Sequence, residues 1–342
     1  MLKTLEQFIV EKSNKDYLKK VNFILAGEKI VGLTGKNNER IYGKINDICL
    51  DELFNSYYAK GDYGKDLEVN SKLPLIYYGG NSKEGLNFLE KYGISEDVMY
   101  NLPEPMKVSG NKSKFYKMFN DCDFICKTVY KKEDAKDLQF PIIAKPDDGH
   151  SGVGIEIFDN YEDLEKSKGD FANYSEAKDL DQEFRVLLMN ETPVLVHERI
   201  SVGDNEIRDK ESDEQTQFTY VDQDMSKLDF MGKVSKICKT IREKLKLGLW
   251  SIDLMIDKSG DCWVAEINAA SGMAADKMAR VYVMVYEDFY GEKLPQEFKT
   301  YLNEEYIKPI YKINLKENEA QIKKSKHCVN YQNVIDGKET IL

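Results

Sequence analysis

The stretch from Trp250 to Asn268 constrains the fold most, because it has the pattern of two strands joined by a tight turn. Apolar residues alternate with polar ones along both halves, and residues 258–261 supply a polar, glycine-containing turn between them. Side chains alternate across a strand, so Glu266 and Asn268 share one face, where Asp253 on the partner strand can join them. We therefore predict a β-hairpin that packs on one side and presents oxygen ligands on the other.

A second pattern, from Pro141 to Ile157, reads as strand, glycine-rich loop and strand, with Lys145 at the end of the first strand. A loop of this kind lets backbone N–H groups close over phosphates, and the lysine supplies a cation for them. It is not a P-loop, since no Gly-Lys-Ser/Thr sequence opens a helix. Three hard oxygen ligands on the hairpin suit a Mg²⁺ ion that phosphates also hold. The two patterns together predict nucleotide chemistry.

Each pattern has a plainer interpretation when it is taken alone. A single Gly-x-Gly stretch is most often an ordinary loop, and acidic residues in a hairpin are usually solvated. The apolar residues that flank Asp253 and Glu266 favour the metal interpretation, because carboxylates in a packed hairpin need a partner.

Three further motifs between residues 109 and 280 stand, together with these patterns, in the order typical of the ATP-grasp superfamily, which the chain resembles. They are Asn111-Lys112-Ser113-Lys114, then Lys127-Thr128-Val129, then Tyr174-Ser175-Glu176-Ala177 followed by Glu183-Phe184-Arg185-Val186. The sequence departs from the family at Cys126, where a proline is usual. The resemblance implies an α+β ATP-grasp fold, in which two α+β lobes clasp ATP and an N-terminal α/β module precedes them.

The resemblance also implies roles for individual side chains. The residues that would bind ATP are Lys112, Lys145, His150, Ser151, Gly152, Val153, Ser175, Glu176, Ala177 and Glu183. The residues that would hold the metal, two Mg²⁺ ions or Mn²⁺ in their place, are Asp253, Glu266 and Asn268. Arg185 shares the face of Glu183, and Arg199 ends a strand-like run, so both are the expected catalytic cations. Two alternatives stay open: Arg185 as a surface arginine paired to a glutamate, and Lys114 in place of Lys112.

We expect four parts along the chain. They are an N-terminal α/β module (1–108), a lobe with both lysines and the glycine-rich loop (109–173), a lobe with the adenine segment, arginines and metal site (174–300), and a C-terminal extension (301–342). Within the first part we expect a helix at Leu2–Lys20, a hairpin at Val21–Leu33 and a strand–turn–helix unit at Leu73–Tyr92. The C-terminal extension is expected to be a peripheral helix and a tail.

The charge balance argues against a nucleic-acid surface. The 342 residues carry 49 Lys and Arg against 60 Asp and Glu, a net charge of −11, whereas such a surface needs a basic stripe. Residues 203–229 hold much of the acidity, with nine acidic and three basic side chains. A run of this kind is usually a solvated loop, and the alternative is recognition of a basic or amino-bearing acceptor.

The cysteines and histidines point to a reducing compartment and to no zinc site. The six cysteines form no C-x-x-C pair, and the histidines at 150, 197 and 327 are scattered. Phe124 and Ile125 suggest that Cys122 and Cys126 flank an apolar core strand. With no signal peptide and no stretch of ~18 apolar residues, we expect a cytoplasmic protein without a membrane partner. A homo-oligomer is compatible with the sequence.

The segment from Glu266 to Met273 resembles the carboxylate–amine ligase branch, which includes D-alanine–D-alanine ligase and protein-modifying glutamate ligases. The resemblance implies an ATP-dependent ligase that joins a carboxylate to an amine of an amino acid, peptide or protein through an acyl phosphate. Ser271 stands where these ligases often have proline, so the substrate is the least determined part. The alternatives are an ATP-grasp kinase that only transfers phosphoryl and a non-catalytic ATP-binding regulatory protein.

Overall fold

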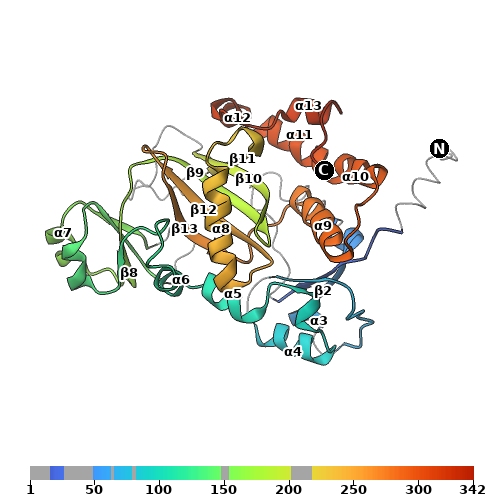
Figure 1. Ribbon diagram of the computed structural model, residues 1–342, viewed down its shortest axis with the longest axis horizontal. Helices are drawn as coiled ribbons and strands as arrows, with labels where there is room; N and C mark the ends of the chain where they lie inside the picture. The colour runs from blue at the N-terminus through green and yellow to red at the C-terminus, as the bar shows by residue number, and fades with distance from the viewer. Residues whose placement is uncertain (1–15, 27–48, 63–64, 79–81, 148–153, 202–217) are drawn as a thin grey trace.

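The structure, a computed structural model, describes residues 16–26, 49–62, 65–78, 82–147, 154–201 and 218–342. These residues form three β-sheets surrounded by helices, which confirms the expected α+β class (Figure 1). The expected helix at Leu2–Lys20 lies largely outside the described residues.

The first sheet is parallel and has the strand order β2-β1-β3-β4. Its strands are β1 (Asn22–Leu25), β2 (Asn55–Tyr58), β3 (Leu75–Tyr78) and β4 (Met99–Tyr100), with helices α3 (Ala59–Asp62) and α4 (Lys83–Lys91) and the short turn η1 (Glu96–Val98). The strand and the helix of the expected strand–turn–helix unit are present as β3 and α4, and the Ser82 side chain caps α4 by accepting a hydrogen bond from Gly85 N. The hairpin expected at Val21–Leu33 is wrong over its described part, because β1 pairs in parallel with β2 and β3. Every residue of β1 is buried, as is typical of a central parallel strand.

The second sheet is small and antiparallel, with the order β5-β8-β6-β7. Its elements are β5 (Thr128–Val129), η2 (Lys132–Asp137), β6 (Ile142–Lys145), β7 (Glu156–Phe158), α7 (Tyr161–Lys166) and β8 (Asn173–Glu176). Its side chains form a core of their own around Ile142, Phe158 and Leu164. Strand β8, which spans the expected boundary at residues 173/174, pairs with β5 and β6, and the division into lobes stays a prediction.

The third sheet is antiparallel, with the order β11-β10-β9-β12-β13. Its strands are β9 (Leu180–Met189), β10 (Thr192–Ser201), β11 (Phe218–Asp222), β12 (Leu249–Asp257) and β13 (Cys262–Asn268). Helices α5 (Pro103–Ser109) and α6 (Lys112–Met118) come earlier in the chain, and η3 (Met225–Lys227) and α8 (Met231–Leu245) connect β11 to β12. The predicted hairpin is confirmed as β12 and β13. Helix α8 crosses one face of this sheet and buries its apolar stripe there (Figure 1). Helix α6 packs into the same core through Phe115 and Tyr116.

Most of the last helices are not peripheral, contrary to the expectation for residues 301–342, although α12 has no buried residue. They are α9 (Ala275–Tyr290), α10 (Gln296–Leu302), the π-turn η4 (Asn303–Ile307), α11 (Lys308–Glu317), α12 (Glu319–Lys324) and α13 (Tyr331–Ile335). Tyr306, Tyr311 and Tyr331 are at most 3 % exposed. They join the core that α9 forms with the first and third sheets. Phe124 and Ile125 are also buried, but in a turn rather than the expected strand. Burial of large aromatic side chains explains why these segments pack inward.

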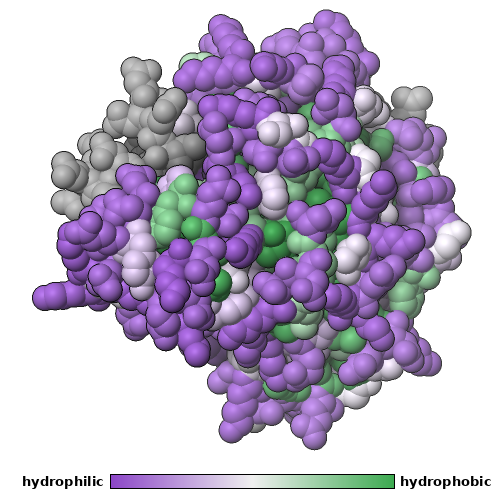
Figure 2. Space-filling view, turned by 60° about the vertical axis from the view of Figure 1, so that its left-hand side comes forward, coloured by the Kyte–Doolittle hydropathy of each residue, from purple (hydrophilic) through white to green (hydrophobic). Residues whose placement is uncertain are grey.

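One face of the molecule is mainly polar. Figure 2 shows one face that is mostly hydrophilic, with apolar residues visible in smaller areas between polar ones. Over the described ranges, the structure contains no helix with the length and apolarity needed to cross a membrane.

Candidate functional site

A row of ionisable side chains crosses the large sheet on one face. Asp222, His197, Arg185, Asp253 and Glu266 occupy matching positions on β11, β10, β9, β12 and β13 in turn. Residues directly opposite each other in antiparallel strands present their side chains to the same face. The strand register, rather than proximity in sequence, therefore gathers five titratable groups into one polar row.

The charges in the polar row are paired with one another. Arg185 donates from Nε and Nη2 to the two carboxylate oxygens of Asp253, both at 2.7 Å. The Lys112 ammonium lies 3.6 Å from a carboxylate oxygen of Glu266. Burial would lower the pKa of Arg185, but the Asp253 carboxylate raises it, so the guanidinium stays charged. The two carboxylates among the expected metal ligands, Asp253 and Glu266, thus already have cationic partners in this structure.

A second set of polar side chains lies two residues along β9 and β10 from Arg185 and His197. The Arg199 guanidinium donates from Nη1 to Glu183 at 3.1 Å, and the Arg185 guanidinium stands 5.3 Å from the centroid of the Tyr220 ring. Glu183 and both arginines therefore face the same side of the sheet, as the sequence predicts. The alternative left open for Arg185 was a surface arginine paired to a glutamate. In the structure its carboxylate partner is Asp253, which is also a proposed metal ligand.

Lys145 reaches this face from the small sheet. Its ammonium donates to the Tyr116 hydroxyl at 2.9 Å, and that hydroxyl donates in turn to the backbone carbonyl of Ala265 on β13. Lys145 is 9 % exposed, so it is held between the small sheet and α6. Tyr116 is a contact that the sequence patterns did not reveal, because it depends on how α6 docks on the large sheet.

The expected adenine segment lies in β8, an interior strand of the small sheet, and continues just past the end of that strand. The backbone N–H of Glu176 donates to Lys127 O at 3.0 Å, and that of Ala177 donates to Pro141 O at 2.9 Å. The Ser175 hydroxyl is hydrogen-bonded to the Thr128 hydroxyl at 2.9 Å. These two backbone donors are therefore engaged within the lobe. The expected phosphate contacts at His150, Ser151, Gly152 and Val153 lie outside the described residues.

The donor set on the hairpin fits a hard cation. Asp253 and Glu266 are cross-strand neighbours, and Asn268 lies two residues beyond Glu266 on the same face. The Asn268 amide oxygen accepts a hydrogen bond from Ala270 N at 2.7 Å, which fixes its orientation. In the part of the chain that the structure describes, no cluster of three or more His, Cys, Asp or Glu side chains has metal-binding geometry. The hairpin set differs because an amide is its third donor, and oxygen donors of this kind suit Mg²⁺.

One polar cluster was missed by sequence reasoning. His197 Nε2 lies 2.6 Å from a carboxylate oxygen of Asp222, and Arg280 on α9 donates to the other oxygen at 3.0 Å. Tyr311 on α11 also donates its hydroxyl to Asp222. Asp222 is 2 % exposed, so the expectation of a solvated acidic run is wrong at this residue. Burial would raise the pKa of Asp222, but His197, Arg280 and Tyr311 together lower it.

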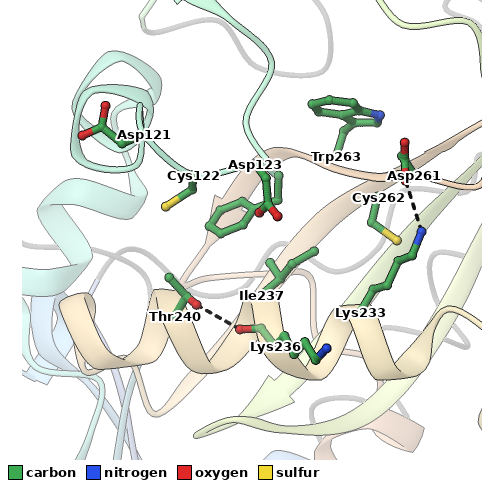
Figure 3. A pocket seen from close by; sticks show the side chains of 11 residues that line it. Asp121, Cys122, Asp123, Lys233, Lys236, Ile237, Thr240, Asp261, Cys262 and Trp263 are labelled. Atoms are coloured by element: carbon green, nitrogen blue, oxygen red, sulfur yellow. Dashed lines mark hydrogen bonds and ion pairs between the residues drawn. The ribbon is translucent and has the colours of Figure 1, made fainter.

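A separate hollow lies beside α8 (Figure 3). Cys122 and Phe124 line it together with Lys233, Cys262 and Trp263. Charges of both signs border the hollow, where Lys233 pairs with Asp261 at 3.2 Å, as Figure 3 shows. The residues expected to bind nucleotide or metal do not line it, so it lies apart from the polar row.

Known proteins resemble this chain in both sequence pattern and fold. A sequence model described as D-ala D-ala ligase C-terminus matches residues 110–286, slightly more than half of the chain. D-alanine–D-alanine ligase from Bacillus anthracis superposes with a TM-score of 0.52 at 13 % identity, over 79 % of this chain and 98 % of that one.

A second solved structure, the ATP-grasp ligase PsnB complexed with minimal precursor, Mg and ADP, superposes with a TM-score of 0.50 at 10 % identity, over 74 % of this chain and 89 % of that one. At these identities the likeness establishes the fold alone. A comparison with curated proteins finds no match. The family match and the three-sheet architecture together show that this chain belongs to the ATP-grasp superfamily, within the D-ala D-ala ligase C-terminus family.

Proposed function

We propose that this protein is an ATP-dependent ligase that joins a carboxylate to an amine through an acyl-phosphate intermediate. The observation that carries the proposal is the polar row, which places Arg185, Asp253 and Glu266 side by side on adjacent strands in a chain of this family. A carboxylate is a poor electrophile, and transfer of the γ-phosphoryl group of ATP makes it reactive. This reaction needs charge stabilisation more than it needs a protein nucleophile, which suits a site of arginines, lysines and carboxylates.

The nucleotide would lie between the small sheet and the large sheet. Lys145 and Lys112 face this region from different elements, and each is within reach of the β13 strand through Tyr116 or Glu266. Glu183 would accept hydrogen bonds from the ribose. Since the N–H groups of Glu176 and Ala177 are engaged, any adenine contact through these residues would use carbonyl or side-chain groups. Residues 150–153 would cover the phosphates.

Asp253, Glu266 and Asn268 would hold Mg²⁺, as two ions, or Mn²⁺ in their place. A divalent ion there would neutralise charge on the phosphates of ATP. For Asp253 to act as a ligand, Arg185 must release it, and the transferring phosphoryl group is the natural new partner for the guanidinium. Arg199 would help in the same way after releasing Glu183. The PsnB structure, which was solved with Mg and ADP, supports this assignment of cofactors.

The acid and the amine are proposed to be amino acids or peptides. The matched family takes its name from a ligase of D-alanine, and PsnB was solved with a precursor. All six cysteines are unpaired, which is consistent with reaction in the reducing cytoplasm. Self-association into a homo-oligomer is compatible with the proposal.

The test is an ADP-release screen over free amino acids of both configurations and dipeptides, run with ATP and Mg²⁺. A ligase releases ADP only with its acid, yields a hydroxamate when hydroxylamine replaces the amine, and forms an amide when the amine is present. Arg185→Ala and Arg199→Ala should each lower this rate by roughly 10²–10³ while retaining most nucleotide binding. Labelled γ-phosphate that stays bonded to the acceptor would establish a kinase instead. Binding of ATP without any turnover would favour a regulatory protein.

A further inference from the structure

His197 lies beside the proposed reaction centre and has no role in the assignments above. It stands directly opposite Arg185 in the pairing of β10 with β9, so the two side chains share a face. The Tyr220 ring contacts both, at 5.9 Å from the His197 ring centroid and 5.3 Å from the Arg185 guanidinium carbon. The His197 side chain is only 7 % exposed. The imidazole is therefore almost buried beside Arg185 on the polar row, where β10 packs against α9.

Asp222 fixes the form of the imidazole. The Asp222 carboxylate is ionised because Arg280 stays charged beside it and Tyr311 donates to it. An ionised carboxylate only accepts hydrogen bonds, so His197 Nε2 must carry the proton that lies in their 2.6 Å contact. The other ring nitrogen, Nδ1, then carries a lone pair, and the hydrogen bonds that the structure shows among its described residues do not use it. Burial lowers the pKa of His197 more than Asp222 raises it, so the ring is neutral near pH 7.

We propose that His197 is the general base that accepts a proton from the attacking amine, and that Asp222 is the positioning residue that orients it. The inference rests on the proposed ligase function. In the step, the amine nitrogen forms a bond to the acyl carbon, and the C–O bond to phosphate breaks with its electron pair leaving on the phosphate. The nitrogen gives one proton to Nδ1 of His197. Asp222 stabilises the imidazolium that results, and solvent later removes the proton.

Other charges near His197 do not offer the same chemistry. The groups that face it from the packed elements are Asp222 and Tyr220 on β11, Arg185 on β9, Asp276, Lys277 and Arg280 on α9, and Tyr311 on α11. The arginines do not release protons at neutral pH. Asp276 has its pKa raised mainly by burial, and it sits at the start of α9 rather than on the sheet. Among these groups, His197 alone combines a lone pair, a fixed tautomer and a place beside Arg185.

The test separates the two halves of the reaction with His197→Gln. Glutamine can still donate to Asp222 but cannot accept a proton, so the fold and the buried hydrogen bond are kept. The amino acid that gives the fastest ADP release in the screen serves as acid, with hydroxylamine or an amino acid as nucleophile. Hydroxylamine is largely a free base at neutral pH and needs little help. We expect hydroxamate formation at the parent rate and amide formation lowered by about 10²–10⁴-fold.

Two further measurements make the result decisive. Raising the pH supplies hydroxide, which can accept the proton in place of the imidazole, so the amide defect of His197→Gln should shrink, while a structural defect would not. His327→Gln is the same substitution at a partly exposed histidine outside the row, whose backbone carbonyl accepts a hydrogen bond from Asp224 N; it should match the parent in both assays. Equal loss of hydroxamate and amide, or amide formation at the parent rate, would overturn the role of His197 while leaving the ligase intact. A parent protein that releases no acid-dependent ADP would overturn the proposed function itself.

Discussion

Removing Arg185 should strengthen the binding of Mg²⁺ in the absence of nucleotide, even though it weakens catalysis. In this structure the Arg185 guanidinium occupies both oxygens of Asp253 at 2.7 Å, so a metal ion must displace it before Asp253 can act as a ligand. The two side chains are 26 % and 29 % exposed, which makes the pair partly buried. Hydrogen bonds between charged groups in such settings contribute ~1.5–3 kcal/mol. Arg185→Ala should therefore raise the affinity for Mg²⁺ alone by roughly 10- to 100-fold.

The assay is calorimetric titration of Mg²⁺ into the nucleotide-free protein, compared among the parent, Arg185→Ala and Arg199→Ala. The second variant is a matched control, because Arg199 pairs with Glu183, which is not a proposed metal ligand. Its affinity for Mg²⁺ alone should equal that of the parent. An unchanged affinity in Arg185→Ala would refute the assignment of Asp253 as a metal ligand. An equal gain in both arginine variants would mean that general electrostatics, rather than competition for Asp253, controls the metal.

Three other substitutions test separate parts of the molecule. Glu266→Gln should reduce Mg²⁺-dependent turnover to a few per cent or less, and higher residual turnover would exclude a metal role. The same substitution should change the free energy of unfolding by only ~0.5 kcal/mol, because the side chain is partly exposed. Tyr331→Ala should cost ~3–5 kcal/mol in urea unfolding, because its ring is buried and stacks on Tyr311 with centroids 4.3 Å apart; a loss under ~1 kcal/mol would contradict the packed C-terminal region. Asp222→Asn should cost ~3–5 kcal/mol at pH 7 by leaving Arg280 poorly compensated. The pKa of Asp222 lies well below its ordinary value of 3.8, so this difference should be constant above about pH 4 and shrink gradually as the pH falls toward the lowered pKa. A difference that stays at its full value down to about pH 2 would show that the charge of Asp222 contributes nothing.

Local patterns were sufficient for the parts of the site that lie within one hairpin or one strand. The strand period alone places Glu266, Asn268 and Asp253 on one face, and a turn at residues 258–261 sets their register. Glu183 and Arg185 are likewise two residues apart on β9. The sequence therefore predicted this half of the candidate site correctly in geometry, while the chemical roles stay predictions.

Features that depend on contacts between distant segments were not predictable in the same way. His197 and Asp222 meet only because β10 and β11 pair in one register across a long connection, and no short motif encodes that register. The burial of Tyr331 depends on α11 and α13 docking together, whereas the lysine-rich stretch around them has the composition of a surface segment. The parallel pairing of β1 was missed because the residues that follow it suggested a turn, and parallel strands leave no local signal of their partner.

The polar cluster around Asp222 also has a consequence for folding during synthesis of the chain. Its partners Arg280, Tyr311 and Tyr331 follow it in the chain by 58, 89 and 109 residues. At ~5–20 residues per second, the last of them leaves the ribosome roughly 5–20 s after Asp222 does. During that interval the β11 end of the large sheet lacks at least part of its helical cover, although β9 and β10 are already available to pair. A translational pause before residue 331 would lengthen the period in which this end of the nascent sheet is exposed to water and to other chains.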